Sequence, residues 1–313
     1  MAQSVGPILL VRGGAIGDFI LTLPVLMALR RNFPGVRLEI LARNRTAPLA
    51  VAAGLADGWR DLEGRESIGL FVPGGEIEPS LCEWFLQFAL VLSYVPDPEG
   101  GLRANFSRIC SARILTGLSR PDETQPRHAA EQFLEPLRAI NITELDPVPQ
   151  LRIQAVPEPI PPAGRWLAVH PGSGSERKNW PEARWADLLA RLGRETDWNF
   201  LIVGGEAEQG KLARLTRHLP AGRFDLAENL PLTELAARLR GGHFFLGHDS
   251  GITHLAAALG LPGLVLWGET NAMVWRPLGG RMNLLTETSG LAELTVEKVF
   301  AELQRRVHFA PMA

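Results

Sequence analysis

The sequence contains little cysteine and little lysine, and the first shortage excludes two classes of protein. Its 313 residues include two cysteines, Cys82 and Cys110, too few for a disulfide framework or a four-cysteine zinc site. No basic residue precedes the first apolar run, 8–11, so we expect no secretory signal. A reducing compartment fits these features best, and we expect a cytoplasmic protein.

An excess of charge of one sign is also missing. The 32 lysines and arginines are balanced by 34 aspartates and glutamates, so the net charge is −2 and no overall field would hold nucleic acid or an anionic membrane. We therefore expect no nucleic-acid partner and at most peripheral contact with a membrane. Only Lys178, Lys211 and Lys298 are lysines, so a lysine in a polar loop is informative.

No apolar run is long and continuous enough for a membrane span. The longest uncharged stretch, 250–268, contains Pro262, several glycines and His254, and it is typical of a helix, a turn and a strand. With 46% hydrophobic and 21% charged residues, the composition is that of a globular chain large enough for about two domains.

The N-terminal half begins with a β-turn-α unit. The apolar run 8–11 predicts a strand, a glycine turn follows, and the amphipathic stretch 18–32 predicts a helix. Alternation with a period of two predicts a second strand over 36–43. The region 73–124 is less regular and predicts no clear order of elements.

A proline-rich segment divides the chain. Residues 156–164 hold four prolines in nine positions, so we expect a linker between a domain over 1–155 and a domain over 165–295, with a last segment over 296–313. Strands and helices alternate after the linker, which predicts an α/β fold with a parallel sheet covered on both faces. The expected strands are 166–169, 200–203, 243–246 and 263–266, and the expected helices are 181–194, 207–217, 232–240 and 250–259.

Ligands bind beyond the carboxyl ends of strands in such sheets, so the loops after strands are the candidate sites. The first loop, RGGAIGD over 12–18, can turn tightly at its glycines and places Asp18 in the first turn of the next helix. Asp18 is either a simple helix cap or a functional carboxylate. A dinucleotide fingerprint would need glycine at Arg12, so the loop does not favour an oxidoreductase.

Two further loops suit parts of a nucleotide. HPGSGSERKNW over 170–180 resembles an anion cradle, because its glycines expose backbone amides, its serines add hydroxyls and Lys178 adds a charge. Its spacing is not that of a Walker loop, and a plain flexible turn is the alternative. VGGEAE over 203–208 places Glu206 where nucleotide-binding sheets hold ribose hydroxyls, although an acid at a helix start is the simpler interpretation.

The fourth loop, LGHDSGITHLAAALGLP over 246–262, is the most informative. A strand ends at Asp249 and Ser250, and a helix begins at once with Thr253 and His254 on its opening turn. Polar side chains at the positive end of a helix suit an anionic, hydroxyl-rich ligand. A role for Ser250 as a helix cap alone would leave His254 unexplained.

Together these loops resemble the ADP-heptose:lipopolysaccharide heptosyltransferases, glycosyltransferase family 9. The matching segments span most of the chain in the family's order: ILLVRGGAIGDFILTLPVLMALRRNFP, RHAAEQFLEPLRAI, VHPGSGSERKNWPEARWADLLARL, LIVGGEAE and LPLTELAARLRGGHFFLGHDSGITHLAAALGLPGLVLWGETNAMVWRPLG. The resemblance implies a GT-B fold, two Rossmann-like doubly wound domains around a central cleft. It also implies that the acceptor binds the first domain and the nucleotide sugar the second, and that a helix in 296–313 packs back toward the first domain.

The resemblance also assigns roles to individual residues. Asp18 matches the family's general base. The donor-binding matches are Ser173, Gly174, Lys178, Glu206, Asp249, Ser250, Gly251, Thr253 and His254. Four residues of the first domain are candidates to receive a phosphorylated or carboxylated acceptor, with solvated surface charge as the alternative for the arginines: Arg12, Gly14, Arg43 and Arg103.

The implied reaction is an inverting transfer of a heptose, or a related sugar, from an ADP-sugar to a lipopolysaccharide core or similar glycan, in the cytoplasm or at the cytoplasmic face of the inner membrane. The sequence has no Asp-x-Asp motif for a metal-bridged diphosphate, so we expect no metal and no cofactor beyond the nucleotide-sugar substrate. The alternatives are a sugar-nucleotide epimerase, a non-catalytic nucleotide- or glycan-binding module, a serine hydrolase, which lacks the usual nucleophile motif, and a metal-dependent hydrolase. The last would use His170, His248, Asp249 and His254.

Overall fold

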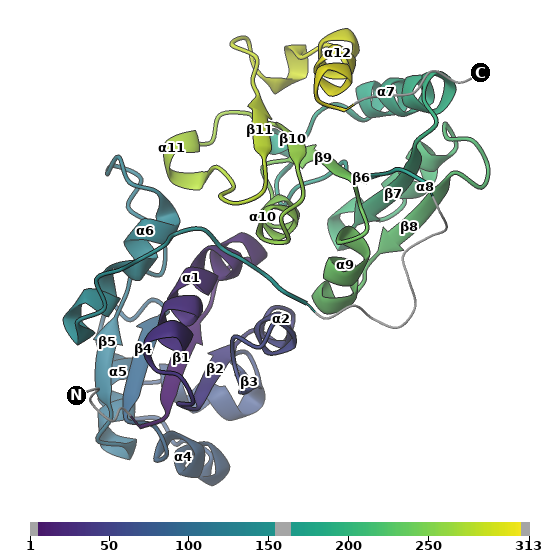
Figure 1. The fold of residues 1–313 in the computed structure, drawn as a ribbon. Coiled ribbons are helices and arrows are strands. Elements are labelled where there is room, and N and C mark those ends of the chain that lie inside the picture. The colour runs from purple at the N-terminus through teal and green to yellow at the C-terminus, as the bar shows by residue number, and fades with distance from the viewer. Residues whose placement is uncertain (1–5, 154–163, 308–313) are drawn as a thin grey trace. The chain divides into compact units, whose positions relative to one another are not determined.

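The computed structural model describes residues 6–153 and 164–307, and the chain divides into two compact units between Ile153 and Gln154. Each unit contains one parallel β-sheet, with helices between successive strands (Figure 1). The predicted α/β class is therefore confirmed. The expected linker, 156–164, lies outside the described residues except for Gly164. Within the described ranges, no helix is both long and apolar enough to cross a bilayer.

The first domain has five parallel strands in the order β3-β2-β1-β4-β5. Its central strands are short runs that are buried along their whole length, as a sheet covered on both faces requires. The strands are β1 (Ile8–Arg12), β2 (Leu38–Ala42), β3 (Gly58–Asp61), β4 (Leu90–Tyr94) and β5 (Arg113–Thr116). The helices are α1 (Ile16–Asn32), α2 (Ala47–Ala52), α3 (Ile68–Phe71), α4 (Pro79–Phe85), α5 (Gly101–Ile109) and α6 (Ala129–Leu134).

The second domain has six parallel strands in the order β11-β10-β9-β6-β7-β8. The four strands expected from the sequence are present within two residues at each end, whereas β8 and β11 were not predicted. The strands are β6 (Trp166–His170), β7 (Asn199–Gly204), β8 (Phe224–Glu228), β9 (Phe244–His248), β10 (Gly263–Leu266) and β11 (Met282–Leu285). The helices are α7 (Glu182–Glu195), α8 (Lys211–Thr216), α9 (Leu232–Leu239), α10 (Gly251–Ala258), α11 (Ala272–Trp275) and α12 (Val296–Arg306).

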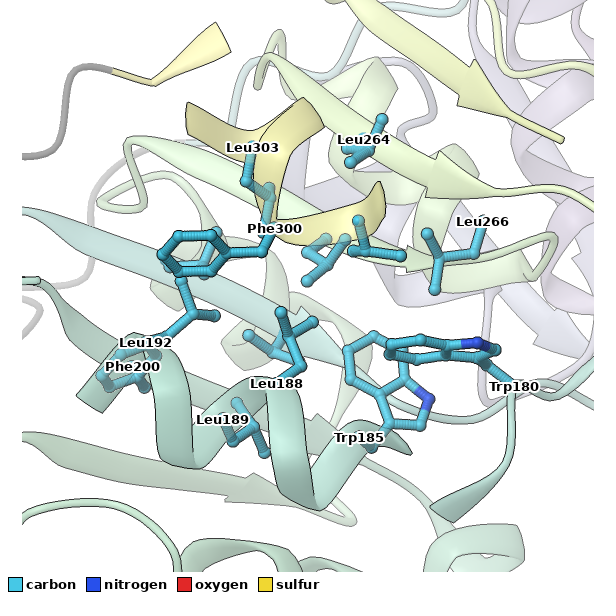
Figure 2. Packing of buried hydrophobic residues seen from close by; sticks show 14 of the residues in the cluster. Trp180, Trp185, Leu188, Leu189, Leu192, Phe200, Leu264, Leu266, Phe300 and Leu303 are labelled. Atoms are coloured by element: carbon cyan, nitrogen blue, oxygen red, sulfur yellow. The ribbon is translucent and has the colours of Figure 1, made fainter. Parts of the chain in front are cut away.

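The last helix, α12, is part of the second domain. Thr295 caps its start by accepting a hydrogen bond from the Lys298 amide at 3.2 Å. Phe300 and Leu303 are buried in the same apolar cluster as Leu188 of α7 (Figure 2). The apolar face of α12 thus closes the core of the second domain. The expectation that the segment 296–313 packs back toward the first domain stays a prediction, and residues 308–313 lie outside the described part of the chain.

The strand orders locate the candidate sites. Counted from its own first strand, the second sheet has the Rossmann order 3-2-1-4-5-6, and the first sheet has 3-2-1-4-5. Strand order reverses between β1 and β4 in the first sheet and between β6 and β9 in the second. In doubly wound sheets, ligands bind beyond the carboxyl ends of the strands at these switch points.

Candidate functional site

The loops after β6 and β9 meet at the switch point of the second sheet. The two strands are hydrogen-bonded neighbours, with His170 at the end of β6 paired to Gly247 near the end of β9. The Lys178 Nζ lies 2.6 Å from Asp249 Oδ2, so an ion pair joins the two loops. The Asp249 side chain is 8% exposed and the Lys178 side chain 41%, so the ammonium group is accessible from solvent. The sequence prediction that these two loops act together is consistent with this contact.

Helix α10 begins directly after Asp249. Ser250 is its N-cap, with its hydroxyl accepting from the Thr253 amide at 3.3 Å. The amides that open a helix have no carbonyl acceptor within it and carry partial positive charge. The Lys178 ammonium group and the first amides of α10 therefore both bring positive charge to the region around Asp249, as an anion-binding site requires.

Two buried histidines hold these loops in place. His170 Nδ1 is 3.2 Å from the Ser250 hydroxyl. His248 Nε2 accepts from the Trp180 amide at 2.8 Å, and its Nδ1 lies 3.3 Å from the Gly172 carbonyl oxygen, so Nδ1 is the protonated nitrogen of a neutral ring. Sequence reasoning considered both histidines only as metal ligands and missed this supporting role.

The electrostatics of the pair follow from burial. Burial, together with the positive charge of Lys211, lowers the pKa of His170 to about 4. Burial likewise lowers the pKa of His248 to about 3, against the hydrogen bond to the Gly172 carbonyl, which raises it. Both rings are therefore neutral at pH 7. The hydrogen bond that His248 Nε2 accepts from the Trp180 amide requires this of His248.

The carboxylate that faces the 170–180 loop is Glu208. Glu206 is exposed on the 3₁₀ turn after β7, where a ribose role stays a prediction. Glu208 is 5% exposed and accepts from the Gly205 amide at 2.8 Å. It lies so close to Gly172 that a Cβ at that glycine would be 1.9 Å from Glu208 Oε1. The sequence did contain a signal for this cap: in VGGEAE, Gly205 stands three residues before Glu208, the spacing at which a carboxylate accepts from the backbone amide at the start of a helical turn.

The remaining predicted donor residues differ in accessibility. The Ser173 hydroxyl donates to the Ser175 carbonyl at 2.7 Å and is committed to a local turn, whereas Gly174 faces open space. The Thr253 hydroxyl donates to the His248 carbonyl and ties α10 to β9. His254 is 5% exposed on the opening turn of α10, beside Gly251 and the N-cap.

Asp18 lies at the switch point of the first sheet. Its Oδ2 accepts from the Ala15 amide at 2.8 Å, which closes the first turn of α1, and its Oδ1 lies 3.8 Å from Arg12 Nη2. The side chain is 16% exposed. Asp18 therefore is a helix cap, and part of its carboxylate still reaches solvent. Gly14 has φ +91°, and a Cβ there would lie 2.8 Å from Asp18 Oδ2, so this glycine makes room for the carboxylate.

The predicted acceptor arginines differ in burial and in their partners. Arg12 is 1% exposed and donates to backbone carbonyls, which corrects its assignment as a residue that meets the acceptor directly. Arg43 forms an ion pair with Glu63 at 2.7 Å. Arg103 is exposed on α5. Roles for Arg43 and Arg103 stay predictions.

The alternative of a metal-dependent hydrolase does not fit the geometry. Both ring nitrogens of His248 face backbone partners, the Trp180 amide and the Gly172 carbonyl. Over residues 6–153 and 164–307, no three His, Cys, Asp or Glu side chains are placed to hold one metal ion. The histidines are thus parts of the scaffold beneath the loops.

Comparison with known proteins agrees with this architecture. Its two Rossmann-ordered domains match the GT-B-like fold of solved glycosyltransferases. A family 9 glycosyltransferase from Veillonella parvula matches with a TM-score of 0.79, at 18% identity, over 97% of this chain and 98% of that one. The ADP-heptose lipopolysaccharide heptosyltransferase II of E. coli matches with a TM-score of 0.75, at 16% identity, over 96% and 98%.

The sequence comparisons agree with the structural ones. Residues 150–303 match the model of glycosyltransferase family 9 (heptosyltransferase). Lipopolysaccharide heptosyltransferase 1 of Pseudomonas aeruginosa is 26% identical over 300 residues, which cover 84% of this chain and 79% of the relative. The second half of the chain therefore matches glycosyltransferase family 9, as the resemblance of its loops predicted, and the comparisons indicate a glycosyltransferase enzyme.

Proposed function

We propose that this enzyme moves a heptose from ADP-heptose to a lipopolysaccharide core or a similar glycan, with inversion and without a metal ion. The Pseudomonas aeruginosa relative carries the name lipopolysaccharide heptosyltransferase 1, and the E. coli heptosyltransferase WaaC, similar in fold, has been solved with ADP and with ADP-2-deoxy-2-fluoro heptose. These names supply the donor and acceptor classes. The reaction takes place in the cytoplasm, with at most peripheral contact with the inner membrane.

One observation carries the donor half of the proposal. The Lys178 ammonium group pairs with Asp249, which directly precedes the Ser250 cap of α10, at the switch point of the second sheet. A nucleoside diphosphate at this point would have its oxygens at the positive helix end, with Lys178 exchanging Asp249 for phosphate. Ser173 and Gly174 border the diphosphate, and Glu206 and His254 serve the nucleoside and sugar sides.

The transfer step breaks one bond and makes another. An acceptor hydroxyl attacks the anomeric carbon, the new C–O bond forms, and the bond to the diphosphate oxygen breaks with its electron pair leaving on ADP. The charge that develops on the leaving oxygens is stabilised by Lys178 and the α10 amides. Asp18 takes the proton from the acceptor hydroxyl, held on the first domain with help from Gly14, Arg43 and Arg103.

Nucleotide titration tests the donor site. ADP, GDP and UDP are titrated into the full chain by calorimetry, and we expect ADP to bind most tightly. Loss of one charge-assisted contact in Lys178→Met should weaken ADP binding roughly 10- to 100-fold. Lys298→Met is the matched control. Lys298, on α12, pairs with Glu287, so its replacement should leave ADP binding unchanged. Equal affinity for the three nucleotides would contradict ADP as the nucleotide of the preferred donor. Unchanged ADP affinity in Lys178→Met would contradict the proposal that the loop over 170–180 binds the diphosphate.

Turnover tests the base. Asp18→Asn keeps an oxygen to accept from the Ala15 amide, so the fold and ADP binding should persist. We expect its kcat to fall roughly 10²- to 10⁴-fold, because a general base contributes about that much. Wild-type turnover by Asp18→Asn would show that another group removes the proton. NMR of the product should show an inverted anomeric centre, and activity should survive EDTA.

A further inference from the structure

A buried arginine joins three chain segments at the switch point of the first sheet. Arg12, the last residue of β1, donates from Nη1 to the carbonyl of Tyr94 at 3.1 Å and to that of Ser119 at 2.8 Å. Its Nη2 donates to the carbonyl of Asp18 at 3.2 Å and lies 3.8 Å from the carboxylate of the same residue. The guanidinium also lies 4.6 Å from the ring centre of Phe133 on α6.

This arrangement is costly, which indicates a role beyond filling the core. Burial lowers the pKa of the Arg12 guanidinium, although the Asp18 carboxylate opposes the shift. Its Nε is buried without a hydrogen-bond partner. Removing an ionised group from water costs several kcal/mol unless its surroundings compensate, and apolar residues often stabilise a core as well or better. The Arg12 guanidinium instead holds the backbone of Asp18 in place relative to Tyr94 and Ser119, through its hydrogen bonds to their carbonyls.

The segment held through Ser119 borders a cavity of about 400 Å³ in the first domain. Thr116, Gly117 and Leu118, directly before Ser119, form part of its wall, and Gln125 and Arg127 line it as well. Through the two ends of one rigid, planar guanidinium, Arg12 thus fixes the start of α1, with Asp18, relative to this wall. A lysine at this position has a single ammonium group and could not keep the same fork of contacts.

We propose that Arg12 is a positioning residue for sugar transfer, holding the Asp18 carboxylate in line with an acceptor bound beside the 116–119 segment. This inference rests on the proposed role of Asp18 as the base. Arg12 contacts no reacting atom: it acts through the backbone and the carboxylate of Asp18. The Arg12 guanidinium, 3.8 Å from the Asp18 carboxylate, is also the ion-pair partner of that carboxylate.

A double-mutant cycle tests the proposal. Arg12→Lys is made in the wild-type and in the Asp18→Asn background, and kcat is measured from ADP release with ADP-heptose as donor and heptose-free lipopolysaccharide core as acceptor. In the wild-type background we expect a loss of roughly 10- to 100-fold, because a misplacement of about 1 Å costs that much. In the Asp18→Asn background we expect no further loss, since the group that Arg12 positions is gone.

Arg30 supplies a matched control on the same helix. At the far end of α1, it donates to the carbonyls of Leu55 and Val36, both at 3.1 Å, and pairs with Asp57 at 2.8 Å. Arg30→Lys therefore removes a similar fork of contacts from the same domain without touching Asp18. We expect a comparable drop in melting temperature but unchanged kcat, whereas Arg12→Lys lowers both.

The outcomes separate this inference from the proposed function. Equal losses from Arg12→Lys in both backgrounds would indicate general damage to the domain and overturn positioning, as would wild-type kcat in Arg12→Lys. Full turnover by Asp18→Asn alone would show that Asp18 is not the general base, and would contradict both the proposed role of Asp18 and that of Arg12. If Arg12→Lys fails to fold, Phe133→Leu removes the ring beside the guanidinium and should show the same dependence on Asp18 with a smaller loss; equal losses in both backgrounds would again overturn the proposal.

Discussion

Acid should destabilise the second domain because its two buried histidines are neutral. In the unfolded chain histidine has a pKa near 6.5, while burial holds His170 at about 4 and His248 at about 3. Between these values the unfolded chain binds more protons than the folded one, so stability is present above pH 6.5 and is lost as pH falls. From pH 7 to pH 5 each histidine should cost about 2 kcal/mol of unfolding free energy, and the pair about 4 kcal/mol.

Urea unfolding followed by tryptophan fluorescence measures this loss. Six of the eight tryptophans lie after residue 164, so the signal reports mainly the second domain. His170→Asn can keep a hydrogen bond to Ser250 but does not titrate, and it should halve the loss between pH 7 and pH 5. His218→Asn replaces an exposed histidine in the same domain and should leave the loss unchanged. A wild-type loss below about 1 kcal/mol would refute the assignment of both rings as neutral and buried.

Two steric predictions concern the same domain. Gly172→Ala brings a Cβ against Glu208 Oε1 and should lower the melting temperature, by an amount equivalent to about 1–3 kcal/mol, and weaken ADP binding; normal affinity in calorimetry would show that the loop can shift freely. Phe300→Ala removes a ring that is 2% exposed and lies 3.9 Å from the guanidinium of Arg191, and should cost about 3–5 kcal/mol in urea unfolding while ADP affinity is kept. A cost near zero would mean that α12 contributes little to the core.

The sequence predicted the central strands of the second sheet because their burial is complete. β6, β9 and β10 are runs in which every residue is buried, and such runs are recognisable without any partner. β8 and β11 are the two edge strands, and most of their residues are only partly buried. Their short, mixed sequences become strands because a neighbouring strand supplies hydrogen bonds, which pattern reasoning does not see.

The candidate site was predicted at the level of loops rather than of atoms. The strand-loop-helix pattern indicated which loops matter, since the carboxyl ends of parallel strands share one edge. It could not distinguish Glu206 from Glu208, because the choice depends on which carboxylate turns back to cap Gly205. Nor could it assign Arg12, whose partners are carbonyls of residues 94 and 119, far along the chain.

The place of α12 matters for dissecting the enzyme into halves. A fragment cut at residue 295 would lose Phe300 and Leu303. The apolar surface around Leu188 would then be exposed to water, and such exposed apolar patches promote aggregation. A fragment of the second domain made for soaking or NMR should run from Gly164 through Val307. In a chimera that combines domains from two enzymes, this terminal helix should be kept with the second domain.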